Sequence, residues 1–118
     1  MKIIDYFNNS DKTLFSYEII PPFRGGSLQK VFELVEQLAP FNPPFIDLTS
    51  RSAESYYQDD GSGQLTQHIK RKRPGTIGIS AAIKNKFNVE TVPHIQCNGF
   101  TKEETEDALI ELNYLGIN

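Results

Sequence analysis

An alternating apolar run, Thr13-Leu14-Phe15-Ser16-Tyr17-Glu18-Ile19-Ile20, stops at the dipeptide Pro21-Pro22. Aromatic and branched side chains favour a strand, and prolines end it because they lack the N–H that a sheet ladder needs. Side chains alternate between the two faces of a strand, so positions 15, 17 and 19 share one face while Ser16 and Glu18 share the other. The run therefore predicts a strand over 13–20 with one polar face.

Outward from this strand, helical and extended segments alternate. Ser27 can cap a helix whose apolar positions follow a 3.6-residue period from Leu28 to Ala39, and Pro40 ends it. The sequence further predicts a strand over 45–50, a long loop over 51–64, a short helix over 65–73, a helix over 76–87, a strand over 92–97 and a last helix after the capping box of Thr101 and Glu104. This alternation is typical of parallel strands joined by right-handed crossovers, so the predicted fold class is α/β.

The second and third predicted strands also carry one polar face each. Asp47 and Thr49 share a face of the second strand, and His94 and Gln96 share a face of the third. A parallel strand covered by helices on both sides is apolar on both faces, which does not fit these strands. We therefore expect the polar side chains to point into the interior of a closed β/α barrel, with functional groups at the carboxyl ends of the strands.

Composition bounds the class of protein. The 118 residues are about one domain's worth of chain, and the net charge of −3 is too small to indicate general attraction to nucleic acid or to a membrane surface. No run of about 18 apolar residues exists to cross a bilayer. A single cysteine, Cys97, cannot form an internal disulfide, and with only His68 and His94 beside it a zinc site is not expected. We expect a cytoplasmic protein with no metal, no nucleic acid and no membrane partner.

Glu18 is the first candidate for chemistry. Desolvation by its neighbours Tyr17 and Ile19 would raise the pKa of its carboxyl group, as suits a general acid. The alternative is a structural carboxylate held by a nearby Arg or Lys, and spacing alone leaves both readings open.

Other polar residues near the strand ends have two readings each. His94 could hydrogen-bond a ligand or orient Glu18 or Asp47, although a satisfied structural histidine is the commoner case. The hydroxyls of Thr49 and Ser50 could bind a ligand, but these residue types are also ordinary at the start of a loop.

The run Lys70-Arg71-Lys72-Arg73 is the one basic cluster of the sequence. It could contact an anionic partner, but four like charges near a helix end are more often a solvated surface. A small self-contained α/β binding module that uses this cluster is therefore the alternative to an enzyme.

Three motifs resemble one enzyme family. Residues 15–22, Phe-Ser-Tyr-Glu-Ile-Ile-Pro-Pro, resemble the F-S-x-E-x-x-P-P opening of the methylenetetrahydrofolate reductases. Residues 45–49, Phe-Ile-Asp-Leu-Thr, resemble that family's second strand, and residues 93–104, together with the helix that ends at Leu115-Gly116-Ile117, resemble its third strand and helix. The motifs stand in the family's order and spacing and cover most of the chain.

The resemblance implies an eight-stranded TIM-type (β/α)8 barrel that binds FAD, takes a hydride from NADH or NADPH and reduces 5,10-methylenetetrahydrofolate to 5-methyltetrahydrofolate. It implies that Glu18 is the acid that protonates the bridging nitrogen of the folate. It also implies that Thr49, Ser50 and Ser52 lie near the flavin and nicotinamide, and that His94 contacts the flavin. The family commonly has an aromatic residue, Gly and Ala after the threonine, where this chain has Ser50-Arg51-Ser52.

A barrel of this type needs roughly 250 residues, so residues 1–118 amount to a single partial domain, the first three or so of its eight strand-helix units. The Arg-Gly-Asp motif that the resemblance implies after Asn118 is absent. We expect this truncated piece to have little reductase activity, to bind FAD weakly and to self-associate through its open sheet edge, and the protein to be a homo-oligomer.

Overall fold

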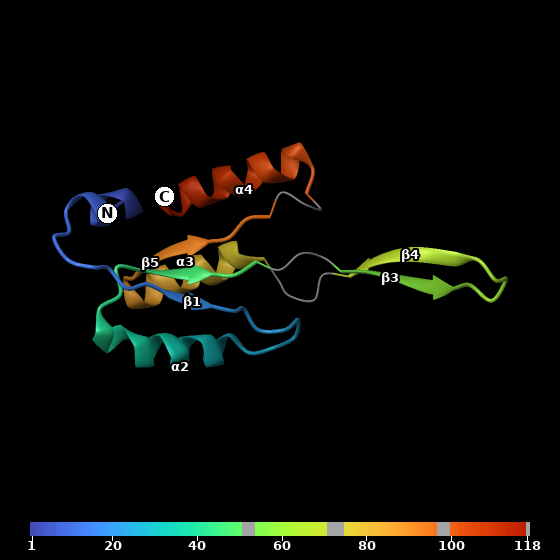
Figure 1. Cartoon of the computed structure of the whole chain (residues 1–118), viewed down its shortest axis with the longest axis horizontal. Coiled ribbons are helices and arrows are strands. Elements are labelled where there is room, and N and C mark those ends of the chain that lie inside the picture. Colours follow the sequence, from blue (N-terminus) through green and yellow to red (C-terminus); the bar gives the residue numbers. More distant parts are fainter. Residues whose placement is uncertain (51–53, 71–74, 97–99, 118) are drawn as a thin grey trace.

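A computed structural model describes residues 1–50, 54–70, 75–96 and 100–117. Its elements, in chain order, are α1 (Ile3–Asn8), β1 (Tyr17–Ile19), α2 (Leu28–Leu38), the 3-10 helix η1 (Ala39–Phe41), β2 (Phe45–Leu48), β3 (Glu54–Asp59), β4 (Leu65–Lys70), α3 (Thr76–Phe87), β5 (Glu90–Pro93) and α4 (Lys102–Tyr114) (Figure 1). None of the helices in these residues is long and apolar enough to cross a membrane.

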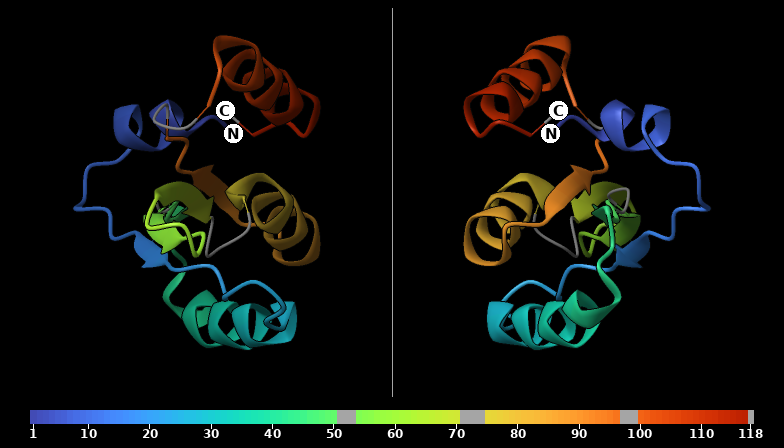
Figure 2. Two further views of the ribbon diagram at one scale, coloured as in Figure 1. Left: turned by 90° about the vertical axis from the view of Figure 1, so that its right-hand side faces the viewer. Right: turned by 90° about the vertical axis from the view of Figure 1, so that its left-hand side faces the viewer.

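The central sheet is parallel, with strand order β1-β2-β5. The predicted α/β class and the three strands of the alternation are thereby confirmed, although each strand is shorter than predicted. β5 also begins two residues before the predicted position 92 and ends at Pro93. Seen along the strands, α2, α3 and α4 follow one another around one side of the sheet and α1 lies on the other side (Figure 2).

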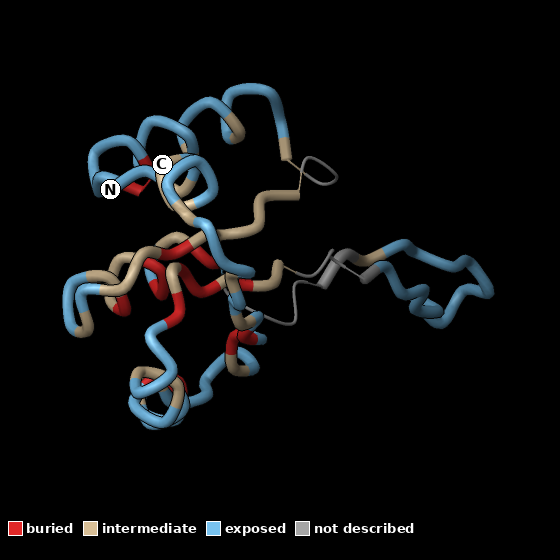
Figure 3. Tube along the Cα trace, turned by 60° about the vertical axis from the view of Figure 1, so that its left-hand side comes forward, coloured by how far each residue is buried: buried red, intermediate tan, exposed pale blue. Residues whose placement is uncertain are grey.

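The core lies between the sheet and helices α2 and α3 (Figure 3). It consists of Ile19, Val31, Val35, Ile46, Leu48, Ile79 and Ile83. Burying an aliphatic side chain of this size contributes about 1.5–3 kcal/mol, so the apolar strand faces hold the two helices against the sheet. The Ser27 hydroxyl caps α2 as predicted, accepting a hydrogen bond from the Gln29 amide at 3.1 Å.

In the described residues 54–70, the predicted loop over 51–64 and the predicted helix over 65–73 are wrong, because β3 and β4 form an antiparallel hairpin. Positions 65 and 69 share a face in a strand as well as in a helix, so their spacing did not distinguish the two. The turn between the strands needs Gly61 and Gly63, whose φ angles of 86° and 82° lie in the left-handed region. Asp59 Oδ1 accepts a hydrogen bond from the Gly61 amide at 2.8 Å. The hairpin extends away from the sheet along the longest dimension of the molecule, which is 63 Å (Figure 1).

Helix α1 was not predicted from the sequence. Its Phe7 ring lies 5.9 Å from the ring of Phe45, the first residue of β2. The Met1 ammonium group lies 3.3 Å from Oε1 of Glu90, the first residue of β5. These contacts place α1 over the amino ends of the strands, so the carboxyl ends on the same face stay uncovered by it.

Candidate active site

The register of the sheet brings the predicted polar residues onto one face. Glu18 is paired with Asp47, and Asp47 is paired with Val92. The next residue pair along the strands is Thr49 and His94, because the His94 amide donates to the Leu48 carbonyl at 2.9 Å. Since paired residues of a sheet share a face, Glu18, Asp47, Thr49 and His94 all lie opposite the core. The prediction that these four share one polar face is confirmed.

Glu18 and Thr49 are joined directly. The Thr49 hydroxyl donates a hydrogen bond to Oε1 of Glu18, and the Thr49 amide donates to the Ile19 carbonyl at 3.0 Å. Oε1 of the carboxylate therefore accepts the Thr49 hydrogen bond, and Oε2 remains for a contact with a ligand.

The sequence predicts that Glu18 is shielded from water, but in the described part of the chain its side chain is exposed to solvent. Its sequence neighbours do not desolvate it because they point to the opposite face of β1. Ile19 is in the core, and the Tyr17 ring lies 6.3 Å from the ring of Phe41. Any exclusion of water from Glu18 must come from groups other than Tyr17 and Ile19.

His94 and Asp47 form the second pair of the site. Nε2 of His94 lies 3.8 Å from Oδ1 of Asp47, and the two side chains are 40 % and 22 % exposed. The His94 carbonyl accepts a hydrogen bond from the Thr76 hydroxyl at 3.0 Å, at the first residue of α3. The end of β5 is thus tied both to β2 and to α3.

Gln96 links the segments that follow β2 and β5. Its side-chain amide donates to the Ser50 carbonyl, so the predicted position of Ser50 beside the other strand ends is observed. Strand alternation predicted that Gln96 lies on the polar face. Its hydrogen-bond partner could not be predicted without the register of the strands. Ser52, Cys97 and residues 71–73 of the basic cluster lie outside the described residues.

A pocket of about 390 Å³ adjoins these strand ends. Its lining includes Ser50, His94, Gln96, Phe100 and the first turn of α3. Gly75, the N-cap of α3, has no side chain that could accept a hydrogen bond from the first turn, and residues 75–78 line the pocket. The volume is within the range of small-molecule sites.

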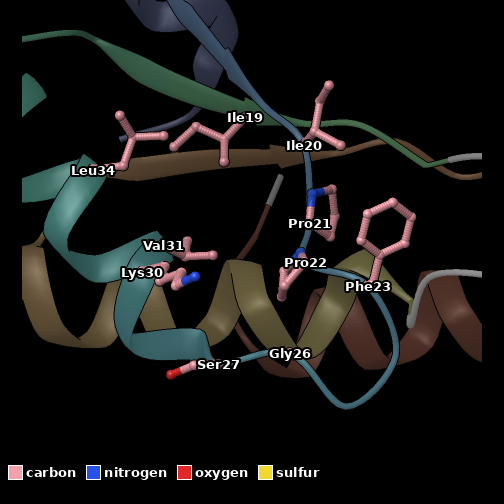
Figure 4. A pocket seen from close by; sticks show the side chains of 10 residues that line it. All are labelled: Ile19, Ile20, Pro21, Pro22, Phe23, Gly26, Ser27, Lys30, Val31 and Leu34. Atoms are coloured by element: carbon pink, nitrogen blue, oxygen red, sulfur yellow. The ribbon is translucent and has the colours of Figure 1, made fainter.

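A second hollow, of about 470 Å³, is lined by Pro21 and Pro22, which follow β1 (Figure 4). Its lining includes Ile19, Val31 and Leu34, with Lys30 as its cation. It opens between β1 and α2, and none of Glu18, Asp47, Thr49 and His94 lines it. It is therefore separate from the polar cluster.

Comparison with known proteins identifies the family. The family model described as methylenetetrahydrofolate reductase matches residues 2–118. This chain belongs to the methylenetetrahydrofolate reductase family. The resemblance of its three motifs to that family is thereby confirmed.

Curated relatives agree with this assignment. The chain is 27 % identical over 120 residues to "Methylenetetrahydrofolate reductase (NADH) 1" of Arabidopsis thaliana, and the match covers 99 % of this chain and 18 % of that protein. It is 28 % identical to "Probable methylenetetrahydrofolate reductase (NADH)" of Oryza sativa subsp. japonica, with the same coverage. Against "Methylenetetrahydrofolate reductase 1" of Schizosaccharomyces pombe it is 26 % identical, with 92 % of this chain and 16 % of that protein covered. The chain thus spans less than a fifth of the length of these reductases.

Proposed function

We propose that this chain supplies the proton-donor face of a flavin-dependent methylenetetrahydrofolate reductase. The reaction is reduction of 5,10-methylenetetrahydrofolate to 5-methyltetrahydrofolate with NADH or NADPH, and the relatives named for NADH favour NADH. The observation that carries the proposal is the hydrogen-bonded pair Glu18 and Thr49 at the carboxyl ends of parallel strands, one strand away from His94. Family membership favours this function over the alternative of a small binding module.

Glu18 acts as the general acid. Because the Thr49 hydroxyl donates to Oε1, the proton to be transferred is held on Oε2. Transfer to the bridging nitrogen of the folate opens its five-membered ring to an iminium, which a hydride can reduce. A positioned acid of this kind contributes about 10²–10⁴-fold to a rate.

The polar residues and the adjoining pocket suit a flavin. The pocket combines apolar walls, such as Phe100, with the His94 imidazole and the Gln96 amide, and planar ring systems bind well in such a setting. Thr49, Ser50, Ser52 and His94 are the residues proposed to hold FAD and the nicotinamide. FAD bound there would supply the hydride transfer between the nicotinamide and the folate.

The sheet supports the view of a partial TIM-type barrel within residues 1–118. In the described residues β1 and β5 are its edges, and each exposes backbone groups that a further strand would pair with. We expect residues 1–118 on their own to bind FAD weakly, to lack reductase activity and to self-associate through these edges, and the full-length protein to be a cytoplasmic homo-oligomer.

The test is a comparison of the full-length protein with residues 1–118 alone. The full-length protein should purify with the absorption spectrum of a flavin and oxidise NADH in proportion to the folate supplied. A full-length protein that has neither bound flavin nor folate-dependent NADH oxidation would contradict the proposed function. Stoichiometric, tight FAD binding by residues 1–118, measured by quenching of flavin fluorescence, would contradict the expected weakness of the shorter chain.

A further inference from the structure

We propose that Asp47 is a positioning residue that orients the His94 imidazole, keeping the ring proton on Nε2 and turning Nδ1 toward the bound ligand. This inference rests on the proposed function for the identity of the ligand, FAD. It concerns a carboxylate to which neither the family match nor the resemblance assigns a role.

The backbone of His94 is fixed independently of its side chain. The amide donates to the Leu48 carbonyl at 2.9 Å, and the carbonyl accepts from the Thr76 hydroxyl at 3.0 Å. With strand β2 on one side and helix α3 on the other, the remaining freedom of this residue is rotation of the imidazole about its side-chain bonds. A group that contacts the ring therefore determines which nitrogen meets a ligand.

Asp47 is placed to control that rotation. It lies in β2 between Glu18 of β1 and Val92 of β5, two residues before the position beside His94. Its Oδ1 lies 3.8 Å from Nε2 of His94, which is an ion-pair distance and one short movement away from a hydrogen bond. At 22 % exposure the carboxylate is largely shielded from water, so its interaction with the ring is screened less than at an open surface.

Glu18, the carboxylate of β1 on this face, has a different partner. Its Oε1 accepts the hydrogen bond of the Thr49 hydroxyl. The two acidic side chains therefore have different contacts: Glu18 accepts a hydrogen bond from Thr49, and Asp47 lies beside the His94 imidazole. Glu18 can therefore act as the proton donor while Asp47 orients His94.

A carboxylate beside one imidazole nitrogen favours a proton on that nitrogen. Placing the proton on Nε2 leaves Nδ1 as the nitrogen that meets the ligand, and Nδ1 has no hydrogen-bond partner in the described part of the chain. Histidines that bind metals are oriented by a carboxylate in the same way, and loss of that carboxylate weakens binding about 10–100-fold.

The test uses the full-length protein and three variants. Asp47→Leu removes the carboxylate and keeps a side chain branched at Cγ, and Asp47→Asn retains the volume and an oxygen that can accept from Nε2. Thr91→Val is the matched control, since Thr91 lies in β5, which ends one residue before His94, is buried on the opposite face and interacts with the Ser80 carbonyl instead. FAD affinity is measured by fluorescence, and the ring tautomer of His94 by NMR on protein labelled with 15N-histidine, assigned with His94→Gln.

We expect Asp47→Leu to raise the dissociation constant of FAD about tenfold, the effect of one hydrogen bond to a charged group. Asp47→Asn should recover most of this loss, and Thr91→Val should change it less than twofold. Without any flavin, the wild-type ring should carry its proton on Nε2, and Asp47→Leu should give a mixture of tautomers.

An unchanged tautomer in Asp47→Leu overturns the proposal, whether or not flavin binds. Equal loss of FAD affinity in Asp47→Leu and Thr91→Val overturns it as well, because general destabilisation of the sheet would then explain the effect. If the wild-type protein binds no FAD but the tautomer shifts as expected, the orienting role of Asp47 is supported and the proposed function fails.

Discussion

The Thr49 hydroxyl donates a hydrogen bond to Oε1 of Glu18, although the two residues are 31 positions apart in the chain. The parallel pairing of β1 with β2 brings them together, because the Thr49 amide also donates to the carbonyl of Ile19. Thr49, the residue that follows the end of β2, thus orients the Glu18 carboxylate of β1. The carboxylate proposed as the proton donor is thus oriented by the pairing of β1 with β2.

Removing the Thr49 hydroxyl should therefore slow proton transfer. We expect Thr49→Val in the full-length protein to lower the rate of folate reduction about tenfold, since a hydrogen bond to a charged group contributes about 1.5–3 kcal/mol. Thr49→Ser keeps the hydroxyl and should retain most of the rate. Rapid-reaction measurements of flavin reoxidation by the folate check this, and equal rates for wild type and Thr49→Val would contradict the role of the hydroxyl.

The core between β2 and helices α2 and α3 should dominate stability. Leu48 is fully buried, so Leu48→Ala should lower the free energy of unfolding by about 2–5 kcal/mol through the cavity that it leaves. Leu109→Ala is the control, because Leu109 is 56 % exposed, and its effect should stay within about 0.5 kcal/mol. Urea unfolding followed by circular dichroism measures both. Similar losses for the two variants would show that the described core is wrong.

Glu90 should contribute stability that depends on pH. Burial raises the pKa of its carboxyl group, but hydrogen bonds from Lys84, at 2.6 Å, and from the Met1 ammonium outweigh this, so the pKa falls below its ordinary value of 4.5. A carboxyl whose pKa is lowered by folding stabilises the protein above the unfolded pKa, and this stability is lost as the pH falls through the folded value.

We therefore expect Glu90→Gln to destabilise the protein by about 1 kcal/mol at pH 7 and by progressively less as the pH falls below 4.5. Glu106→Gln is the matched control, since Glu106 pairs with Lys102 on the surface of α4 and such pairs contribute little. Thermal unfolding at a series of pH values measures the difference. A constant effect of Glu90→Gln across the series would rule out the charge of Glu90 as its cause.

Much of the parallel sheet and its helices could be predicted from sequence. Ser27 and Thr101 mark helix starts through local hydrogen bonds, and both caps are confirmed. Strand parity placed Glu18, Asp47 and His94 on one face because the side-chain period of a strand is strictly two. These features depend on neighbours within a few residues.

The features that could not be predicted depend on distant contacts. Helix α1 has six residues, too few to be stable alone, and is held by Phe7 on Phe45 and by the Met1 ammonium on Glu90. The hairpin was missed because positions 65 and 69 satisfy both helical and strand periods. The pairing of Glu18 with Thr49 needed the strand register, and the exposure of Glu18 followed from the opposite orientation of its two neighbours in sequence.

The most direct test of the central claim is Glu18→Gln in the full-length protein, with the two half-reactions measured separately. Glutamine keeps the volume and accepts the Thr49 hydrogen bond but cannot supply the proton. We predict that folate reduction falls by about 100-fold or more while reduction of the flavin by NADH stays within a few-fold. Glu33→Gln, on the surface of α2, should leave both rates unchanged. Equal loss of both half-reactions in Glu18→Gln, or loss of neither, would contradict the role of Glu18 as the proton donor.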